Sequence, residues 1–484
     1  MQQVDCEVPA ARGGGSGQSR NVVAALLVLG VFVAISSATL AADFRFIYFS
    51  AYLWFGFAYG MCLQYGRFCM ASAIRDLFAV GVPRMAVGIM IAVVLFSLVS
   101  AGVTVFGRNT FHASPIGLYS IVGGLVFGIG MVFTGGCASG SLYKTGEGSV
   151  AALLVVLSLS FTQVLVVDTG SWSNVLVPDS WTASAAAKGL PAELTATDGW
   201  YDQFLAGYVW DLKATTVGQA LGFASPVAAA FIGNSLVNSI LPALAILVAI
   251  YAGWFRKGYL KTLSTPYRGA ATELEGLWAM VTASRRTAIA GLILGVTAGL
   301  HMWVMQALQQ ALGIYNAGEL LQAMGHVEGL SIQDTVFDPG YFYITTQEAQ
   351  GAGWVFEKLG VNVRDSIFFG LDNGVPNPLL NPVLWMSVSL VGGAAAMALL
   401  NNEFKLKFPS REIALWAIGG GVLMGVGARI GLGCNIGAFF ATVTNGDPSG
   451  WLFGLGMTAG GFIGVKFFSW WIERKMEREM SLDL

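Results

Sequence analysis

The sequence predicts an all-α polytopic membrane protein with about ten transmembrane helices, built as an inverted repeat with paired re-entrant half-helices. Three observations lead to this prediction. Hydrophobic residues make up 55% of the chain and charged residues only 11%. Long apolar runs recur along the chain, and two stretches with glycine-flanked cysteines resemble each other. Together these features indicate a chain surrounded by lipid whose two halves share one architecture.

The low charge content excludes an ordinary soluble protein. A soluble domain carries about 25% charged residues, and a soluble chain of 484 residues would need two or three such domains. The net charge of -2 gives no basic field for nucleic acid, so no nucleic-acid partner is expected. The five cysteines are odd in number and widely spaced in apolar surroundings, which argues against a disulfide framework.

Continuous apolar runs mark the transmembrane helices, because about 20 apolar residues cross the hydrocarbon core. A β-barrel would show shorter segments of alternating polarity. The first run follows a basic start and is long enough to span, so we expect a retained helix, although Ala41 and Ala42 leave cleavage open. The runs lie at residues 21–41, 46–62, 84–106, 116–134, 149–168, 234–255, 287–312, 382–400, 413–430 and 449–471.

Basic residues give the orientation, because cytoplasmic loops of membrane proteins are rich in Lys and Arg. The basic residues gather after 234–255, within 401–412 and in the C-terminal tail, and ten spans place all three on the side of the N-terminus. We therefore expect a multi-pass protein of the bacterial inner membrane, in contact with membrane lipid, with both termini in the cytoplasm. The expected division is a cytoplasmic tail at 1–20, a first transmembrane helix at 21–41, a first repeat at 45–168, a periplasmic insertion at 169–233, a transmembrane helix with a cytoplasmic loop at 234–286, a second repeat at 287–471 with a periplasmic insertion at 313–381, and a cytoplasmic tail at 472–484.

Several short segments stand between the long runs. Residues 66–79, 135–148 and 431–446 begin with glycine-rich breaks and are too short or too polar to span. We expect them to be re-entrant half-helices, which membrane proteins tolerate only where the backbone is buried in protein or lines a cavity. A fourth short segment is expected at 301–314, and it has no cysteine to match Cys69.

An internal repeat links two of these segments. Residues 121–160 and 417–456 both contain an apolar helix with paired glycines, a GGC or GLGC break, a stretch of small residues and another helix. Under the expected topology the 116–134 helix runs inward and the 413–430 helix runs outward, so the two units are inverted. Inverted repeats with broken helices are typical of transporters, whose site lies where the repeats meet.

The repeated cysteines are the strongest candidate site residues. Cys137 follows two glycines and precedes Ser139, and Cys434 precedes Asn435 in the same local pattern. A half-helix that begins there would turn backbone N–H groups and its positive dipole end to a cavity, which favours an anion. A thiol adds a soft, polarizable group, which suits an anion that contains sulfur. The alternatives are buried packing for each cysteine and helix capping for Asn435.

Three further residues complete the candidate pathway. Cys69 follows Arg67, which would attract an anion at the cytoplasmic mouth or extend to lipid headgroups. Arg429 lies near the outer end of an apolar helix, where an ionisable group usually faces the bundle interior. It would concentrate anions there or anchor the helix at the interface. Two negative charges in hydrocarbon are very costly unless they are compensated. Arg429, the thiols and the helix N-termini would compensate for the lost hydration of the ion.

No cofactor is expected. The three histidines are scattered and suggest no metal site, and the chain lacks a GxxxxGK[ST] motif for ATP. No coupling-ion site is evident in the sequence either, so passive and gradient-driven movement both stay open.

The segments GRFCMASAIRDLF, GGCASGS and GLGCNIGA resemble the motifs of the YeeE/YedE family, the sulfur-transport family of bacterial inner membranes. The resemblance covers roughly 45–168, 287–306 and 383–471. It implies thiosulfate uptake as a sulfur source for cysteine synthesis, with no enzymatic step. It also implies that three cysteines contact the ion at a narrow constriction. By motif these are Cys69, Cys137 and Cys434.

Other functions stay open from the sequence. The two large insertions depart from the family pattern, so the substrate and any partner are uncertain. A selenium compound or another sulfur ion would use similar chemistry, and a cytoplasmic sulfurtransferase is a candidate partner for which the chain would serve as an anchor. A membrane-bound sulfur-transfer protein would carry a persulfide on one cysteine, although no histidine lies near the three cysteines in sequence to activate one.

Overall fold

A computed structural model describes most of the chain. The N-terminal 14 residues, including Cys6, and most of the predicted insertion at 169–233 lie outside the described part. Within that part, every regular element is a helix. The described residues are 15–105, 118–166, 231–263, 266–326, 344–361, 377–431 and 433–482.

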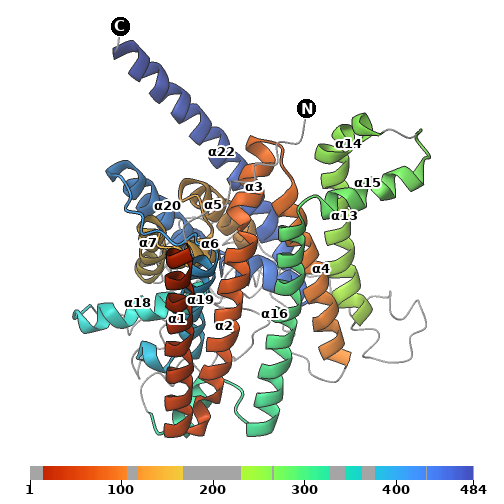
Figure 1. Cartoon of the computed structure of the whole chain (residues 1–484). Coiled ribbons are helices and arrows are strands. Elements are labelled where there is room, and N and C mark those ends of the chain that lie inside the picture. Colours follow the sequence, from red (N-terminus) through yellow and green to blue (C-terminus); the bar gives the residue numbers. More distant parts are fainter. Residues whose placement is uncertain are drawn as a thin grey trace, which may run out of the picture.

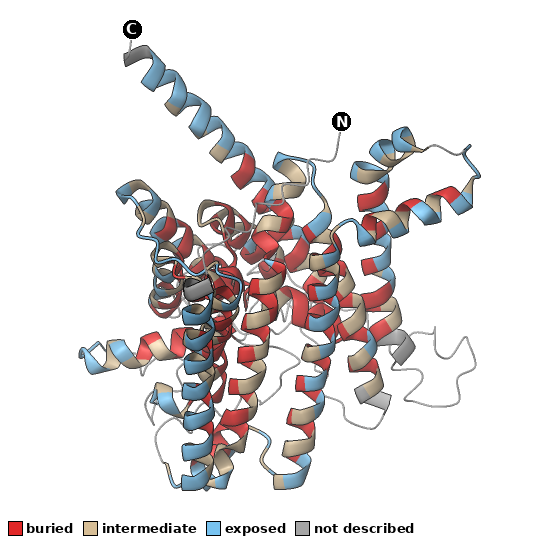
Figure 2. Ribbon diagram, viewed as in Figure 1, coloured by how far each residue is buried: buried red, intermediate tan, exposed pale blue. Residues whose placement is uncertain are grey.

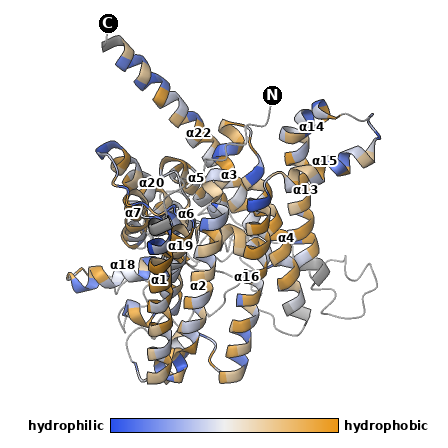
Figure 3. Cartoon of the chain, in the orientation of Figure 1, coloured by the Kyte–Doolittle hydropathy of each residue, from blue (hydrophilic) through white to orange (hydrophobic). Residues whose placement is uncertain are grey.

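All ten predicted runs form helices, which confirms the all-α polytopic class. Nine helical stretches of the described chain are long and apolar enough to cross a bilayer, and α7 is a shorter apolar helix. Hydrophobic residues occupy most of the length of these helices, whereas the C-terminal part of α22 also carries polar residues (Figure 3). The ten are α1 (Gly15–Ala42), α2 (Ile47–Gly66), α4 (Arg84–Val105), α5 (Leu118–Phe133), α7 (Val150–Val166), the run of η2 (Phe231–Ile240), α13 (Leu241–Ile250) and η3 (Tyr251–Phe255), α16 (Arg285–Leu312), α19 (Pro382–Leu400), α20 (Arg411–Ile430) and α22 (Ser449–Leu482).

Short helices fill the three predicted breaks that carry a cysteine. They are α3 (Met70–Ala79), α6 (Ala138–Gly146) and η6 (Asn435–Ala441), the last continued by α21 (Thr442–Thr444). In each case the cysteine is the extended residue just before the first helical turn. The glycine-rich sequence stops the long helix, and the small residues after the cysteine allow a short one to begin.

The short segment predicted at 301–314 does not exist as a separate element. Residues up to Leu312 continue α16 as one unbroken 28-residue helix, which ends at Gly313 in a left-handed conformation (φ 66°). The polar residues at 301–312 were misleading, because His301, Gln306 and Gln309 are buried on one face of a continuous helix.

The remaining elements are short connectors and two helices of the predicted insertion at 313–381. In this second group, α18 lies against α7 and α19, and half of its residues are buried. The connectors α14 and α15 project at the same end of the bundle as the C-terminal part of α22 (Figure 1). The bounds of all these remaining elements are η1 (Phe44–Phe46), α14 (Arg256–Thr262), α15 (Ala270–Thr282), α17 (Ala317–Ala323), α18 (Ile344–Lys358) and η5 (Pro378–Leu380).

Helix packing follows the same plan in both halves. In this plan α2, α4, α5 and α7 of the first half correspond to α16, α19, α20 and α22 of the second. The contact of α2 with α19 then matches that of α16 with α4, and the contact of α5 with α22 matches that of α20 with α7. The α3 helix contacts α4 and α22 as α18 contacts α19 and α7. This correspondence makes α18 the counterpart of α3, a place that the sequence prediction gave to 301–314. The inversion of the two halves stays a prediction.

Glycines bring the paired helices close together. A Cβ at Gly60 of α2 would lie 2.0 Å from the carbonyl oxygen of Leu390 on α19, and a Cβ at Gly393 of α19 would lie 2.0 Å from that of Phe57 on α2. Small residues at helix interfaces are how membrane helices gain packing energy in lipid. Buried residues concentrate where the short helices meet, whereas α1 is largely exposed at the edge (Figure 2).

Candidate functional site: three buried thiols at the starts of short helices

The first thiol is that of Cys137, before α6. Gly135 adopts a left-handed conformation (φ 65°), which turns the chain out of α5 and places Cys137 at the start of the next helix. The Cys137 side chain is fully buried. Its Sγ lies 3.5 Å from the hydroxyl oxygen of Ser139. The two predicted site residues are therefore in hydrogen-bond contact inside the bundle.

Cys69 brings a second thiol to the same place. The α2 helix ends at Arg67, whose left-handed conformation (φ 51°) reverses the chain and lets Phe68 donate to the carbonyl of Leu63. Cys69 is then 1% exposed, and its Sγ lies 3.7 Å from that of Cys137. Both are free cysteines, and we call them the thiol pair.

A glycine makes room for the thiol pair. A Cβ at Gly140, in the first turn of α6, would lie 2.6 Å from the Sγ of Cys69 and 3.2 Å from that of Cys137. Any larger residue would fill the space between the sulfurs. The glycine in the sequence CASGS is therefore required by the close approach of the Cys69 side chain to α6.

Cys434 lies on the other side of the apolar interior, before η6. Its side chain is 1% exposed, and the backbone N–H of Ile436 donates to its Sγ at 3.3 Å. The Nδ2 of the neighbouring Asn435 lies 3.3 Å from the Sδ of Met70, the residue after Cys69. Asn435 therefore connects the two cysteine-bearing segments directly.

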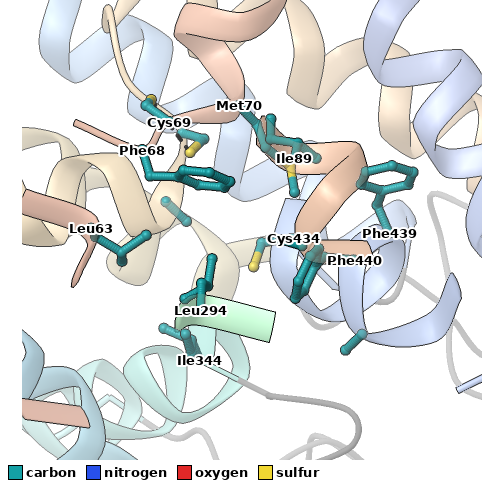
Figure 4. Close-up of a cluster of buried hydrophobic side chains, with 14 of the residues drawn as sticks. Leu63, Phe68, Cys69, Met70, Ile89, Leu294, Ile344, Cys434, Phe439 and Phe440 are labelled. Carbon is teal, nitrogen blue, oxygen red and sulfur yellow. Dashed lines mark hydrogen bonds between the residues drawn. The ribbon is translucent and has the colours of Figure 1, made fainter. Parts of the chain in front are cut away.

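Apolar side chains separate Cys434 from the thiol pair. In the view of Figure 4, Phe68 lies between the levels of Cys69 and Cys434, Met70 lies at the level of Cys69, and Phe440 and Leu294 lie near the level of Cys434. All belong to one buried cluster or pack against it. Among the described residues of this interior, the cysteine thiols and the Asn435 amide offer polar contacts, and the polarizable sulfurs suit a soft anion.

Two candidate arginines occupy different environments. Arg67 pairs with Glu403 at 2.9 Å, with 64% of its side chain exposed, so its charge is balanced at the end of the bundle. Arg429 is 8% exposed in the last turn of α20. Its guanidinium lies within the protein, where an ionisable group is usually functional.

A cluster of polar side chains closes the bundle beyond the thiol pair, and we call it the polar cap. Gln64 Nε2 donates to Glu403 at 2.6 Å and lies 3.4 Å from Glu147. Burial opposes ionisation of Glu403, but hydrogen bonds from Arg67 and Gln64 and the charges of Arg67 and Arg286 outweigh it and lower the pKa of this carboxyl. Burial instead raises the pKa of Glu147.

Sequence reasoning missed one part of this interior. Glu348 was assigned to the polar insertion, yet the structure buries it in α18, near Cys434. Thr345 of the same helix interacts with the Cys434 thiol. The available signal was the run TTQEAQ, which has too few apolar residues for a spanning helix and no basic residue of a surface loop.

Comparison with known proteins decides the family. The family described as sulphur transport matches residues 65–463. The chain belongs to this family. Its members are transporters, so the chain is a transporter and not an enzyme, and the resemblance of the cysteine motifs to the YeeE/YedE family is confirmed.

Individual relatives agree with this assignment. The chain is 27% identical over 414 residues to the thiosulfate transporter TsuA of Spirochaeta thermophila, covering 82% of this chain and 92% of the relative. It is 25% identical over 428 residues to the thiosulfate transporter TsuA of Escherichia coli, covering 87% and 94%. A shorter match, 31% identical over 130 residues, joins 26% of this chain to 32% of the probable transporter YedE of Salmonella typhimurium.

Proposed function

We propose that this protein imports thiosulfate across the bacterial inner membrane, with both termini in the cytoplasm. The names of two thiosulfate transporters, whose length the chain covers almost completely, support thiosulfate as the substrate. The observation that carries the proposal is the set of three buried thiols, each at the start of a short helix in the middle of an apolar bundle.

The proposed path runs from the outer side to Cys434 and then to the thiol pair. A dianion in an apolar interior needs compensation, and helix starts, thiols and the Asn435 amide offer it without a fixed positive charge that would trap the ion. Ser139 would hold the thiol of Cys137 in place, and Arg429 would raise the anion concentration outside Cys434. The ion moves by successive contacts, and no bond to sulfur forms.

The polar cap lies at the inner end of this path. The basic loops predict that end to be cytoplasmic, and α14, α15 and the end of α22 lie there. The ion pair between Arg67 and Glu403 would block the path at this end, and the anion would pass when the ion pair breaks. An ion released at this end would be available to a cytoplasmic sulfurtransferase.

The test is uptake of radiolabelled thiosulfate in cells that lack other thiosulfate importers. Wild type should take up label, and Cys137→Ala should lose at least about tenfold in rate, which corresponds to about 1.4 kcal/mol in the barrier. Cys62→Ala is the matched control, because Cys62 is also buried but bonds to the carbonyl of Ala290 on α16. No uptake of thiosulfate by wild type, together with uptake of labelled selenite or sulfite, would instead indicate a carrier for those ions.

A further inference from the structure

One buried carboxyl in the bundle has no place in the path described so far. Glu348 projects from α18, and its side chain is 7% exposed. Its Oε1 makes no hydrogen bond within the described residues. An ionisable group held inside a membrane bundle is costly to maintain and is usually functional.

Neighbouring polar atoms are also unsatisfied. The Oε1 of Gln163 on α7 and the Nε2 of Gln347 on α18 have no hydrogen-bond partner among the described groups. Ser387 of α19 lies within hydrogen-bonding reach of the Glu348 carboxyl, and Gln163 Nε2 donates to the carbonyl of Thr345 at 3.0 Å. Buried polar atoms normally find partners, so the unsatisfied atoms of α7 and α18 leave hydrogen-bonding capacity for a small polar guest such as water near the carboxyl.

This polar site adjoins Cys434. Thr345 lies within hydrogen-bonding reach of the Cys434 thiol, and Glu348, three residues further along α18, lies near the same thiol. The elements packed on α18 are α7, α19 and η5, and none of them contains a titratable residue. On α18 itself, Glu357 and Lys358 stand at the opposite end. Cys434 is therefore the titratable group in the described chain that shares the site with Glu348.

We propose that Glu348 is the proton-binding residue that couples inward movement of the anion to inward movement of a proton. Ionised, Glu348 places a negative charge beside the position of the anion at Cys434 and repels it across a poorly screening interior. Protonated, it is neutral and admits the anion. The proton therefore binds a Glu348 oxygen from the outer side as the anion reaches Cys434, and it is released toward the cytoplasm when the anion moves on to the thiol pair.

A dianion that enters a cell moves two negative charges against an inside-negative membrane potential. One proton that moves with it reduces the net charge moved from two to one and adds the driving force of the proton gradient. This inference rests on the proposed function, and it adds the driving ion that the sequence did not reveal.

The test uses purified protein in liposomes, with and without an inward proton gradient. The gradient should raise the initial rate of thiosulfate uptake by wild type at least about fivefold, a usual size for coupling between two ligands. Glu348→Gln mimics the protonated acid, so it should exchange internal for external thiosulfate yet show no stimulation by the gradient. Glu357→Gln, on the same helix, is the control and should keep the stimulation.

Each outcome decides between the possibilities. Stimulation that persists in Glu348→Gln overturns the assignment, as does wild-type uptake driven by sodium and indifferent to protons. If Glu348→Gln does not fold, a second measurement decides: addition of thiosulfate to wild-type liposomes should make the outside medium alkaline, and a constant pH overturns the proposal. No exchange of thiosulfate by wild type would instead reject the proposed function itself.

Discussion

Gly140→Ala is the substitution that the geometry of the thiol pair addresses most sharply. The new methyl carbon would lie 2.6 Å from the Sγ of Cys69 and 3.2 Å from that of Cys137, whereas such contacts are ordinarily about 3.5–4.0 Å. The overlap with Cys69 is therefore about 1 Å. Neither sulfur can move away freely, because both are buried. Overpacking of this kind costs about 1–3 kcal/mol.

If the anion must pass this point, the same overlap raises the transport barrier. A cost of about 1–3 kcal/mol corresponds to a loss of about 5-fold to 150-fold in rate. The assay is the initial rate of thiosulfate uptake per unit of folded protein, together with the melting temperature of the purified protein. Gly419→Ala on α20 is the control, since a Cβ there meets nothing within 4 Å.

A double variant separates the local overlap from a general defect. Removal of the Cys69 sulfur removes the 2.6 Å overlap and leaves the Cβ of residue 140 at 3.6 Å from the Cβ of Cys69 and at 3.2 Å from the Sγ of Cys137. The drop in melting temperature that Gly140→Ala causes should therefore be smaller in the Cys69→Ala background than in wild type. A folded Gly140→Ala protein that transports at the wild-type rate would refute the argument that the ion passes between these sulfurs.

Three further predictions concern packing, the polar cap and the link between the cysteine-bearing segments. Gly60→Ala would press a methyl group onto a carbonyl oxygen of α19 and should lower the melting temperature, whereas Gly102→Ala, in open space, should raise stability by up to about 1 kcal/mol. Because the pKa of Glu403 is lowered, its pairing with Arg67 stabilises the fold above the ordinary carboxyl pKa, and this stabilisation is lost as pH falls through the lowered pKa. On acidification the melting temperature of wild type should therefore drop more than that of Glu403→Gln. Equal drops would contradict this prediction. Asn435→Ala removes the contact with Met70 and should slow uptake about fivefold, the effect of about 1 kcal/mol; an unchanged uptake rate would mean that this contact is dispensable.

Much of the fold follows from the sequence because lipid imposes simple rules. A spanning helix needs a long apolar run, and every such run formed a helix. The breaks at Cys69, Cys137 and Cys434 were also predictable, because glycines stop one helix and small residues allow another to begin. The position of a short helix at each break follows from the same local chemistry.

The pairing of segments across the bundle was harder to predict. The 3.7 Å approach of Cys69 to Cys137 depends on Gly140, and nothing in the spacing of 68 residues indicates it. The segment at 301–314 was mistaken for a break because buried polar residues imitate one. Glu348 was misjudged for the opposite reason, since a buried polar helix looks like a surface loop when its packing partners are unknown.

The central claim is that thiosulfate moves along the buried thiols of this chain without any other protein. Exchange of radiolabelled thiosulfate by purified protein in liposomes, with wild type compared with Cys434→Ala, tests it most directly. The account predicts rapid exchange by wild type and a rate near that of empty liposomes for the variant. Equal exchange by a folded Cys434→Ala protein would contradict it.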